Sequence, residues 1–142
     1  MSETNMRHKV LKVLKPIGAF PVENPCRPGT PDVNHWHGWI ELKYRVGWPK
    51  RENTIIRLHR FTINQKRFLR DRYNGNKDAF LLVRIGGREW FLFKGNTVEP
   101  VGRELNRKEF CRHAYKHWTS TSDMEKEIIQ CLQQKKGRYE KN

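Results

Sequence analysis

The chain of 142 residues is long enough for one domain with a sizeable core and too short for two ordinary domains. It carries 29 Lys and Arg against 15 Asp and Glu, a formal net charge of +14, so nucleic acid is the expected partner. No apolar run approaches the roughly 20 residues that cross a bilayer, and Cys26, Cys111 and Cys131 form no disulfide motif. We therefore expect a cytoplasmic protein without a membrane partner.

Helical and strand periodicities alternate along the chain. In chain order we expect a helix at 3–15, strands at 18–22, 32–36 and 39–45 with a His37-Gly38 turn between the last two, a helix from about 62 to 76, strands at 79–85 and 89–93, and helices at 107–118 and 122–135. Loops are expected at the Pro- and Gly-rich residues 24–31 and across the basic residues 47–60, which should be exposed. This order predicts an α/β or α+β domain in which helices flank a mixed central sheet.

The strand expected at 39–45 has a clear period of two. Ile40 and Leu42 alternate with Glu41 and Lys43. Because successive side chains of a strand point to opposite faces, the apolar pair should face a core. Glu41 and Lys43 should then point together to the other face of the sheet.

Three polar residues of this hairpin form the pattern with the clearest chemical meaning. Asp32 begins one strand, and Glu41 and Lys43 lie on the next. Carboxylate oxygens are the hard ligands that Mg²⁺ binds, and carboxylates on paired strands can converge on one ion. A lysine two residues from Glu41 shares its face and can reach a water or phosphate beside that ion. The pattern favours phosphodiester hydrolysis, and its alternative is an ordinary exposed charge pattern of little energetic worth.

The segment Pro31-Asp32, followed by Glu41-Leu42-Lys43, resembles the motif of the PD-(D/E)XK nuclease superfamily. The similarity covers roughly residues 3–93 and points to the compact branch, which includes Holliday junction resolvases, VRR-NUC nucleases and related phage endonucleases. It implies a restriction-endonuclease-like core, Asp32 and Glu41 as ligands of Mg²⁺ or Mn²⁺, and Lys43 as the cation that positions or deprotonates the attacking water.

Two further residues match positions that this family often uses. The resemblance implies Glu3 as an acidic metal ligand on the first helix and Gln65 as a catalytic residue on the helix after the Glu-x-Lys strand. Both also have simpler explanations. Glu3 is a favourable acid in the first turn of a helix, and Thr62 with Gln65 fits a capping box. Glu23 is the other candidate for the additional carboxylate.

Basic side chains gather in the expected loop and in the first turns of the following helix. Those expected to contact DNA phosphates are Lys50, Arg51, Arg57, Arg60, Lys66, Arg67 and Arg70. Trp48 of the same loop could stack on an unpaired base. A solvated, disordered loop would explain the same residues. His113 and His117 have the spacing of a zinc pair, but no motif supplies a third ligand, so we interpret them as part of a solvated helix face.

These features together predict a metal-dependent DNA endonuclease. Its core would span residues 1–100, with a C-terminal helical extension at 101–136 packed on the same domain and a flexible tail at 137–142. The expected substrate is branched DNA, such as a Holliday junction, in recombination, repair or phage replication. Symmetric cutting of a junction would require a homodimer. The alternatives are a DNA-binding protein that keeps the fold without the chemistry, and a restriction-type endonuclease.

Overall fold

The computed structural model describes residues 3–23 and 27–133, so Cys26 and the predicted tail lie outside the described residues. Its elements in chain order are α1 (Glu3–Val13), the 3-10 helix η1 (Lys15–Ile17), β1 (Phe20–Pro21), β2 (Val33–His35), β3 (Gly38–Arg45), α2 (Ile63–Asn76), β4 (Ala79–Ile85), β5 (Glu89–Lys94), the 3-10 helix η2 (Gly95–Thr97), α3 (Arg107–His113), β6 (Lys116–Trp118) and α4 (Thr121–Leu132). The elements predicted up to residue 94 are confirmed in type and in order.

The six strands form one mixed sheet in sequence order, β1-β2-β3-β4-β5-β6. All neighbouring strands are antiparallel except β3 and β4, which are parallel over Trp39–Arg45 and Ala79–Ile85. A parallel pair needs a crossover, and α2 supplies it. The predicted fold class, a mixed sheet flanked by helices, is therefore confirmed. Among the described residues, no helix is long and apolar enough to cross a membrane.

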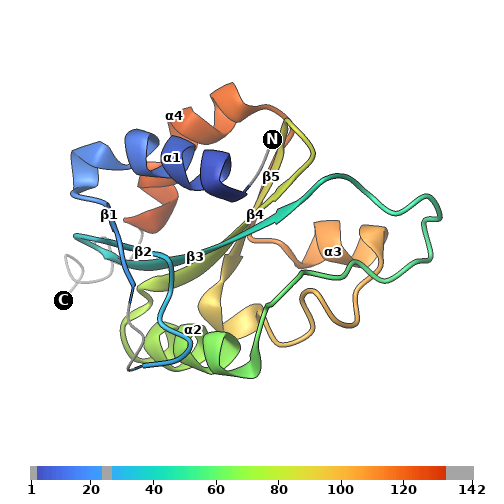
Figure 1. Cartoon of the computed structure of the whole chain (residues 1–142), viewed down its shortest axis with the longest axis horizontal. Coiled ribbons are helices and arrows are strands. Elements are labelled where there is room, and N and C mark those ends of the chain that lie inside the picture. The colour runs from blue at the N-terminus through green and yellow to red at the C-terminus, as the bar shows by residue number, and fades with distance from the viewer. Residues whose placement is uncertain (1–2, 24–26, 134–142) are drawn as a thin grey trace, which may run out of the picture.

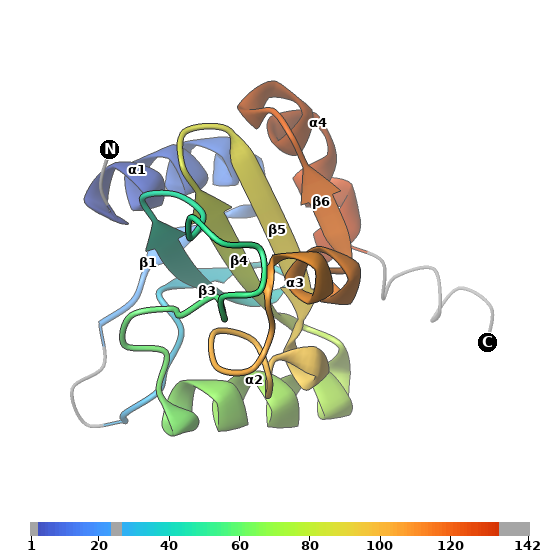
Figure 2. The ribbon, with the colours of Figure 1, turned by 90° about the vertical axis from the view of Figure 1, so that its right-hand side faces the viewer.

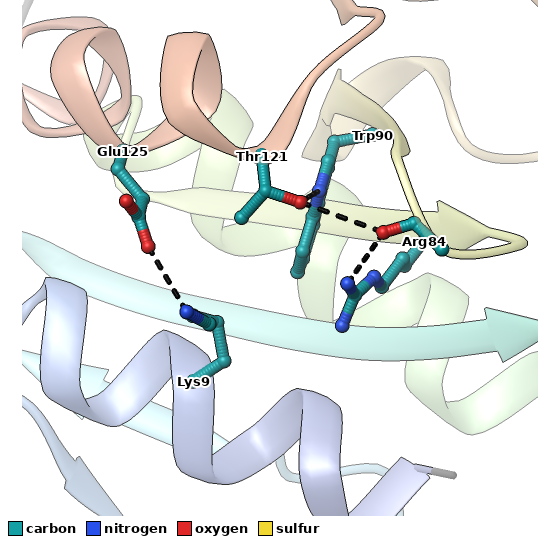
Figure 3. A network of polar contacts seen from close by, with 6 residues as sticks. Lys9, Arg84, Trp90, Thr121 and Glu125 are labelled. Carbon is teal, nitrogen blue, oxygen red and sulfur yellow. Dashed lines mark hydrogen bonds and ion pairs between the residues drawn. The ribbon is translucent and has the colours of Figure 1, made fainter. Parts of the chain in front are cut away.

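Helices cover both faces of the sheet, with α1 and α4 on one face and α2 and α3 on the other (Figure 1). The first face buries apolar residues from α1, α4 and the strands, among them Met6, Ile40 and Leu42. Polar contacts also link elements on this side of the sheet (Figure 3). The Nζ of Lys9 on α1 lies 3.2 Å from a carboxylate oxygen of Glu125 on α4.

The hairpin turn lies one residue earlier than predicted. Trp36 and His37 form it, and Gly38 is already the first residue of β3. The backbone of Gly38 has φ +141°, and a Cβ atom there would lie 1.9 Å from the carbonyl oxygen of Asp78. Only glycine therefore fits at residue 38, where β3 enters the sheet beside the start of β4.

Residues 107–118 were predicted to form one helix, and this prediction is wrong. The helix α3 ends at His113, and β6 follows and pairs with β5, as Figure 2 shows. The backbone N–H of Tyr115 donates to the carbonyl of Leu92, and Trp118 is buried. The free edge of β5 offers backbone partners that residues 107–118 alone do not reveal. The C-terminal extension is thus part of the sheet and not purely helical.

This strand also separates the two histidines that were interpreted as one helix face. His117 lies on β6, where its ring stacks on Phe91 at a centroid distance of 4.1 Å and its Nε2 lies 2.9 Å from a Glu89 carboxylate oxygen. His113 ends α3 and contacts the carbonyl of Thr97. The i, i+4 relation expected for a helix therefore does not hold.

Residues 46–62 connect β3 to α2 across the second face of the sheet (Figure 1). The prediction of an exposed loop is only partly correct. Ile56 and Leu58 are buried with Leu69, Phe91 and Phe110 in an apolar cluster between the sheet, α2 and α3, the second core cluster. Ile55 forms an isolated bridge with Asn106. These contacts hold the connection against the domain and fix the place where α2 begins.

Candidate active site

The predicted triad comes together at the edge of β3. Val33 pairs with Ile40, but β2 extends no further, so within the described part of the chain the edge of β3 beyond Ile40 has no strand partner on this side. Asp32 replaces the missing strand with its side chain, because its Oδ2 accepts a hydrogen bond of 3.1 Å from the backbone N–H of Leu42. This contact holds the Asp32 carboxylate beside Glu41.

Glu41 is a buried carboxylate in an unfavourable environment. The residue is 1 % exposed, and its Oε1 has no hydrogen-bond partner among the described residues. The pKa of Glu41 is raised from 4.5 to about 8, chiefly by burial and then by the negative charge of Asp32, while Lys43 opposes the shift. Two carboxyl groups held this close favour either a shared proton or a cation.

Lys43 lies on the same face of β3 as Glu41, as predicted, and is 5 % exposed. Its Nζ lies 3.3 Å from Oε2 of Glu41 and donates a 2.9 Å hydrogen bond to the carbonyl oxygen of Arg60. The Phe61 ring centroid is 5.5 Å from the same Nζ, a favourable distance for a cation. Lys43 is thus held by one carboxylate, one carbonyl and one aromatic ring.

A pocket of about 240 Å³ opens between α1 and β3 at this edge. Its lining includes Glu3, Thr4, Met6, Arg7, Asp32 and Leu42. The structure therefore brings Glu3 and Asp32 to one pocket, whereas Glu23 is exposed just before residues 24–26, which lie outside the described ones. Within residues 3–23 and 27–133, no three His, Cys, Asp or Glu side chains are arranged to hold a metal ion.

The capping-box explanation of Gln65 is confirmed. Its Oε1 accepts from the backbone N–H of Thr62 at 3.0 Å, and its own N–H donates to the Thr62 hydroxyl at 3.2 Å. This oxygen is therefore used at the start of α2 and does not hold Lys43. Lys43 instead donates its hydrogen bond to the carbonyl of Arg60.

Most of the predicted phosphate contacts are exposed. These are Lys50, Arg51, Arg57, Arg60, Arg67 and Arg70. Lys66 differs, because it is 6 % exposed and its Nζ donates to the carbonyl of Glu99 at 2.7 Å. Burial lowers its pKa. Lys66 is a structural lysine here, which a sequence pattern of exposed basic residues does not distinguish.

Trp48 also has a packing role that the sequence did not indicate. Its ring contacts Phe91 and Phe110 edge-on, with centroid distances of 5.6 and 5.9 Å, and the Arg107 guanidinium lies 4.5 Å from its centroid. Its Nε1 donates to Glu89 at 2.7 Å. These contacts fix the indole against the second core cluster, so we leave Trp48 out of the proposed DNA contacts.

Two features of the site were missed at the level of sequence, the Arg60 carbonyl and the Phe61 ring. Residues 58–61 contain neither Gly nor Asn, the usual signals of a backbone with positive φ. Aromatic residues near a basic loop are common in cores, so Phe61 carried no specific signal either. Only the folded positions of β3 and of residues 46–62 bring both groups to Lys43.

Comparisons with protein-family models, with curated proteins and with solved structures find no match for this chain. The function of this chain must therefore be inferred from the site itself. Its donor set fits a hard divalent cation, because it presents carboxylate oxygens only, one of them buried without a hydrogen-bond partner among the described residues. Mg²⁺ is commonly held by one or two carboxylates and keeps several waters, so a pair of carboxylates suffices.

Proposed function

We propose that this protein is a metal-dependent DNA endonuclease of the PD-(D/E)XK type. The observation that carries the proposal is the buried Glu41 carboxylate, which shares the edge of β3 with Asp32 and Lys43 in a chain of net charge +14. Buried titratable groups with strongly shifted pKa values concentrate at functional sites. Such an acidic pair has no use in a surface that only binds phosphates.

Asp32 and Glu41 would hold Mg²⁺ or Mn²⁺. Glu3, which lines one pocket with Asp32, would be the additional acidic side chain. When bound, such an ion lowers the pKa of a coordinated water and stabilises negative charge on the scissile phosphate. Lys43 keeps its ammonium beside Glu41 and can orient the attacking water or balance the phosphate charge. Asp32 also fixes the backbone at Leu42, and so keeps Glu41 and Lys43 in register.

DNA would reach this edge across the exposed basic residues of the 46–62 connection and of α2. Arg57 and Arg60 are exposed on the connection whose Arg60 carbonyl contacts Lys43, and Arg67 is exposed on α2. Contacts of this kind position a phosphate backbone without reading its sequence. We therefore propose recognition of DNA structure, with branched DNA such as a four-way junction as the substrate, and a homodimer where two strands are cut symmetrically.

The decisive experiment is cleavage of a labelled panel containing a four-way junction, a flap, single-stranded and duplex DNA. Wild type should cut at least one member with Mg²⁺ or Mn²⁺ and none in EDTA. The Lys43→Ala variant should lose about 10²-fold or more of this activity while still binding DNA. Lys126→Ala on the exposed surface of α4 is the matched control and should cut like wild type.

If wild type binds the panel and cuts no member with either ion, the nuclease proposal fails and a DNA-binding module takes its place. A discrete set of fragments from plasmid DNA would instead point to a restriction-type enzyme. A single monomer mass at working concentration would count against symmetric junction cutting.

A further inference from the structure

The Arg60 backbone adopts a conformation that its side chain does not favour. Its φ is +58°, in the left-handed region that glycine and asparagine adopt most readily. A hydrogen bond from the Phe61 N–H to the Leu58 carbonyl closes a turn around it, at 3.4 Å. The third position of a type II turn requires a positive φ, which makes Gly or Asn the usual choice there.

The chain holds this turn from both ends. Before it, Leu58 is buried, and its N–H donates to the carbonyl of Gly102 at 3.4 Å. After it, Thr62 caps α2 through the reciprocal hydrogen bonds with Gln65. A left-handed residue between two anchored neighbours is a conformation that the surrounding structure enforces, and such conformations cluster at functional sites.

The turn directs the Arg60 carbonyl at Lys43. The distance from Nζ to this oxygen is 2.9 Å, shorter than the 3.3 Å from Nζ to Glu41. A carbonyl oxygen accepts a hydrogen bond without carrying a net charge, so it orients the ammonium and leaves its positive charge for the substrate. The Phe61 ring, next in the chain, lies beside the same ammonium.

Resting on the proposed function, we infer that Arg60 is a positioning residue, whose left-handed backbone aims its carbonyl at Lys43 and so sets the position of the catalytic ammonium. Glycine would serve this backbone better but would remove a cation from the DNA-binding side. Arginine at this position therefore serves two separable purposes. Its backbone affects kcat through Lys43, and its exposed guanidinium affects KM through the DNA backbone.

Two substitutions separate these purposes. Arg60→Asn and Arg60→Val both remove the cation, but only asparagine adopts a positive φ readily. Both variants should raise KM for DNA to a similar extent. Arg60→Val should also lower kcat by about 10²-fold, since misplacement of a catalytic group by about 1 Å has this effect, whereas Arg60→Asn should keep kcat within a few-fold of wild type.

Lys77 provides a matched control pair. It has the same φ of 58° as the C-cap residue of α2, and it lies at the far end of that helix from Thr62. Lys77→Val should therefore destabilise the fold by an amount similar to Arg60→Val, but the ratio of kcat between Lys77→Val and Lys77→Asn should stay near one. An equal drop in kcat for both valine variants would assign the effect to general destabilisation and overturn the inference.

A second measurement does not depend on catalysis. Metal-free protein is treated with a succinimidyl ester, and acylation of Lys43 is followed by peptide mass spectrometry. Lys43 should react slowly in wild type and in Arg60→Asn, and several-fold faster in Arg60→Val. In Lys77→Val and Lys77→Asn, Lys43 should react at the wild-type rate. Equal Lys43 labelling in Arg60→Val and Arg60→Asn overturns the positioning role even if DNA is cut. The expected labelling together with no cleavage by wild type supports the positioning role and rejects the proposed function.

Discussion

The two faces of β3 have opposite characters although the same eight residues form both. Ile40 and Leu42 face α1 and α4 and join an apolar cluster. Glu41 and Lys43 face α2 and α3 and are just as buried, at 1 % and 5 % exposure. Burial of the first pair stabilises the fold by the ordinary hydrophobic effect. Burial of the second pair removes two ionisable groups from water, and their mutual attraction when both are charged offsets this cost only in part.

The difference shows where the molecule departs from what stability alone would select. An apolar pair at 41 and 43 would complete the second core cluster, and replacing buried ion pairs by apolar residues is often neutral or stabilising. Local departures from stable packing are expected at functional sites. We therefore take the first face as the foundation of the domain and the second as the place of its chemistry, and the following substitutions test that division.

The largest effect is expected for Glu41→Gln. This change keeps the volume of the side chain but removes its charge, so cleavage of the best DNA substrate should fall by about 10²-fold or more. The fold should be retained, because a neutral amide suits the buried position at least as well as a carboxylate. Glu125→Gln on α4 is the control and should cut normally. Full activity of Glu41→Gln would remove this residue from the site.

Ile40→Ala tests the opposite face. Ile40 is fully buried, so its truncation should lower the free energy of unfolding by about 2–5 kcal/mol in a urea titration. Cleavage per folded molecule should stay within a few-fold of wild type, measured well below the melting temperature. A variant that is folded but inactive would mean that the two faces of β3 are not separable.

The raised pKa of Glu41 predicts how the stability of the metal-free protein depends on pH. Below pH 4.5 the carboxyl is protonated in both the folded and the unfolded chain. Between 4.5 and about 8 the unfolded chain releases the proton while the folded protein keeps it, so the free energy of unfolding should fall across this range and level off above about 8.

The difference between wild type and Glu41→Gln in EDTA isolates this contribution from other titrating groups. The variant should gain stability relative to wild type as the pH rises through this range. Mg²⁺ should raise the melting temperature of wild type more at pH 8 than at pH 6, since the ion competes with the proton. A difference in the free energy of unfolding between the two proteins that does not change with pH would contradict the raised pKa of Glu41.

The smallest effect is expected at Gln65, which lies near the second face but acts as a helix cap. Gln65→Ala should cost about 1 kcal/mol of stability, because it opens the capping box. Gln65→Glu keeps the box and should be close to wild type. Both should retain kcat within a few-fold. A large loss of kcat in both variants would restore the catalytic role that the family resemblance implies.

Local patterns were enough to predict much of this protein. The period of two in β3 determines that Glu41 and Lys43 share a face, because alternation in a strand is a geometric necessity. Thr62 and Gln65 identify the start of α2, since a capping box satisfies backbone groups within one turn. The order of elements up to β5 and the pairing of Asp32 with the Glu-x-Lys strand followed from such short-range rules.

Tertiary structure alone decided the rest. Residues 116–118 became a strand because β5 offered a free edge. Lys66 became buried and Trp48 partly buried because the 46–62 connection folds over the second face. The same connection carries the Arg60 carbonyl to Lys43, across 17 positions of sequence. Contacts at such separations depend on where whole elements pack, and neither residue type nor spacing encodes that position locally.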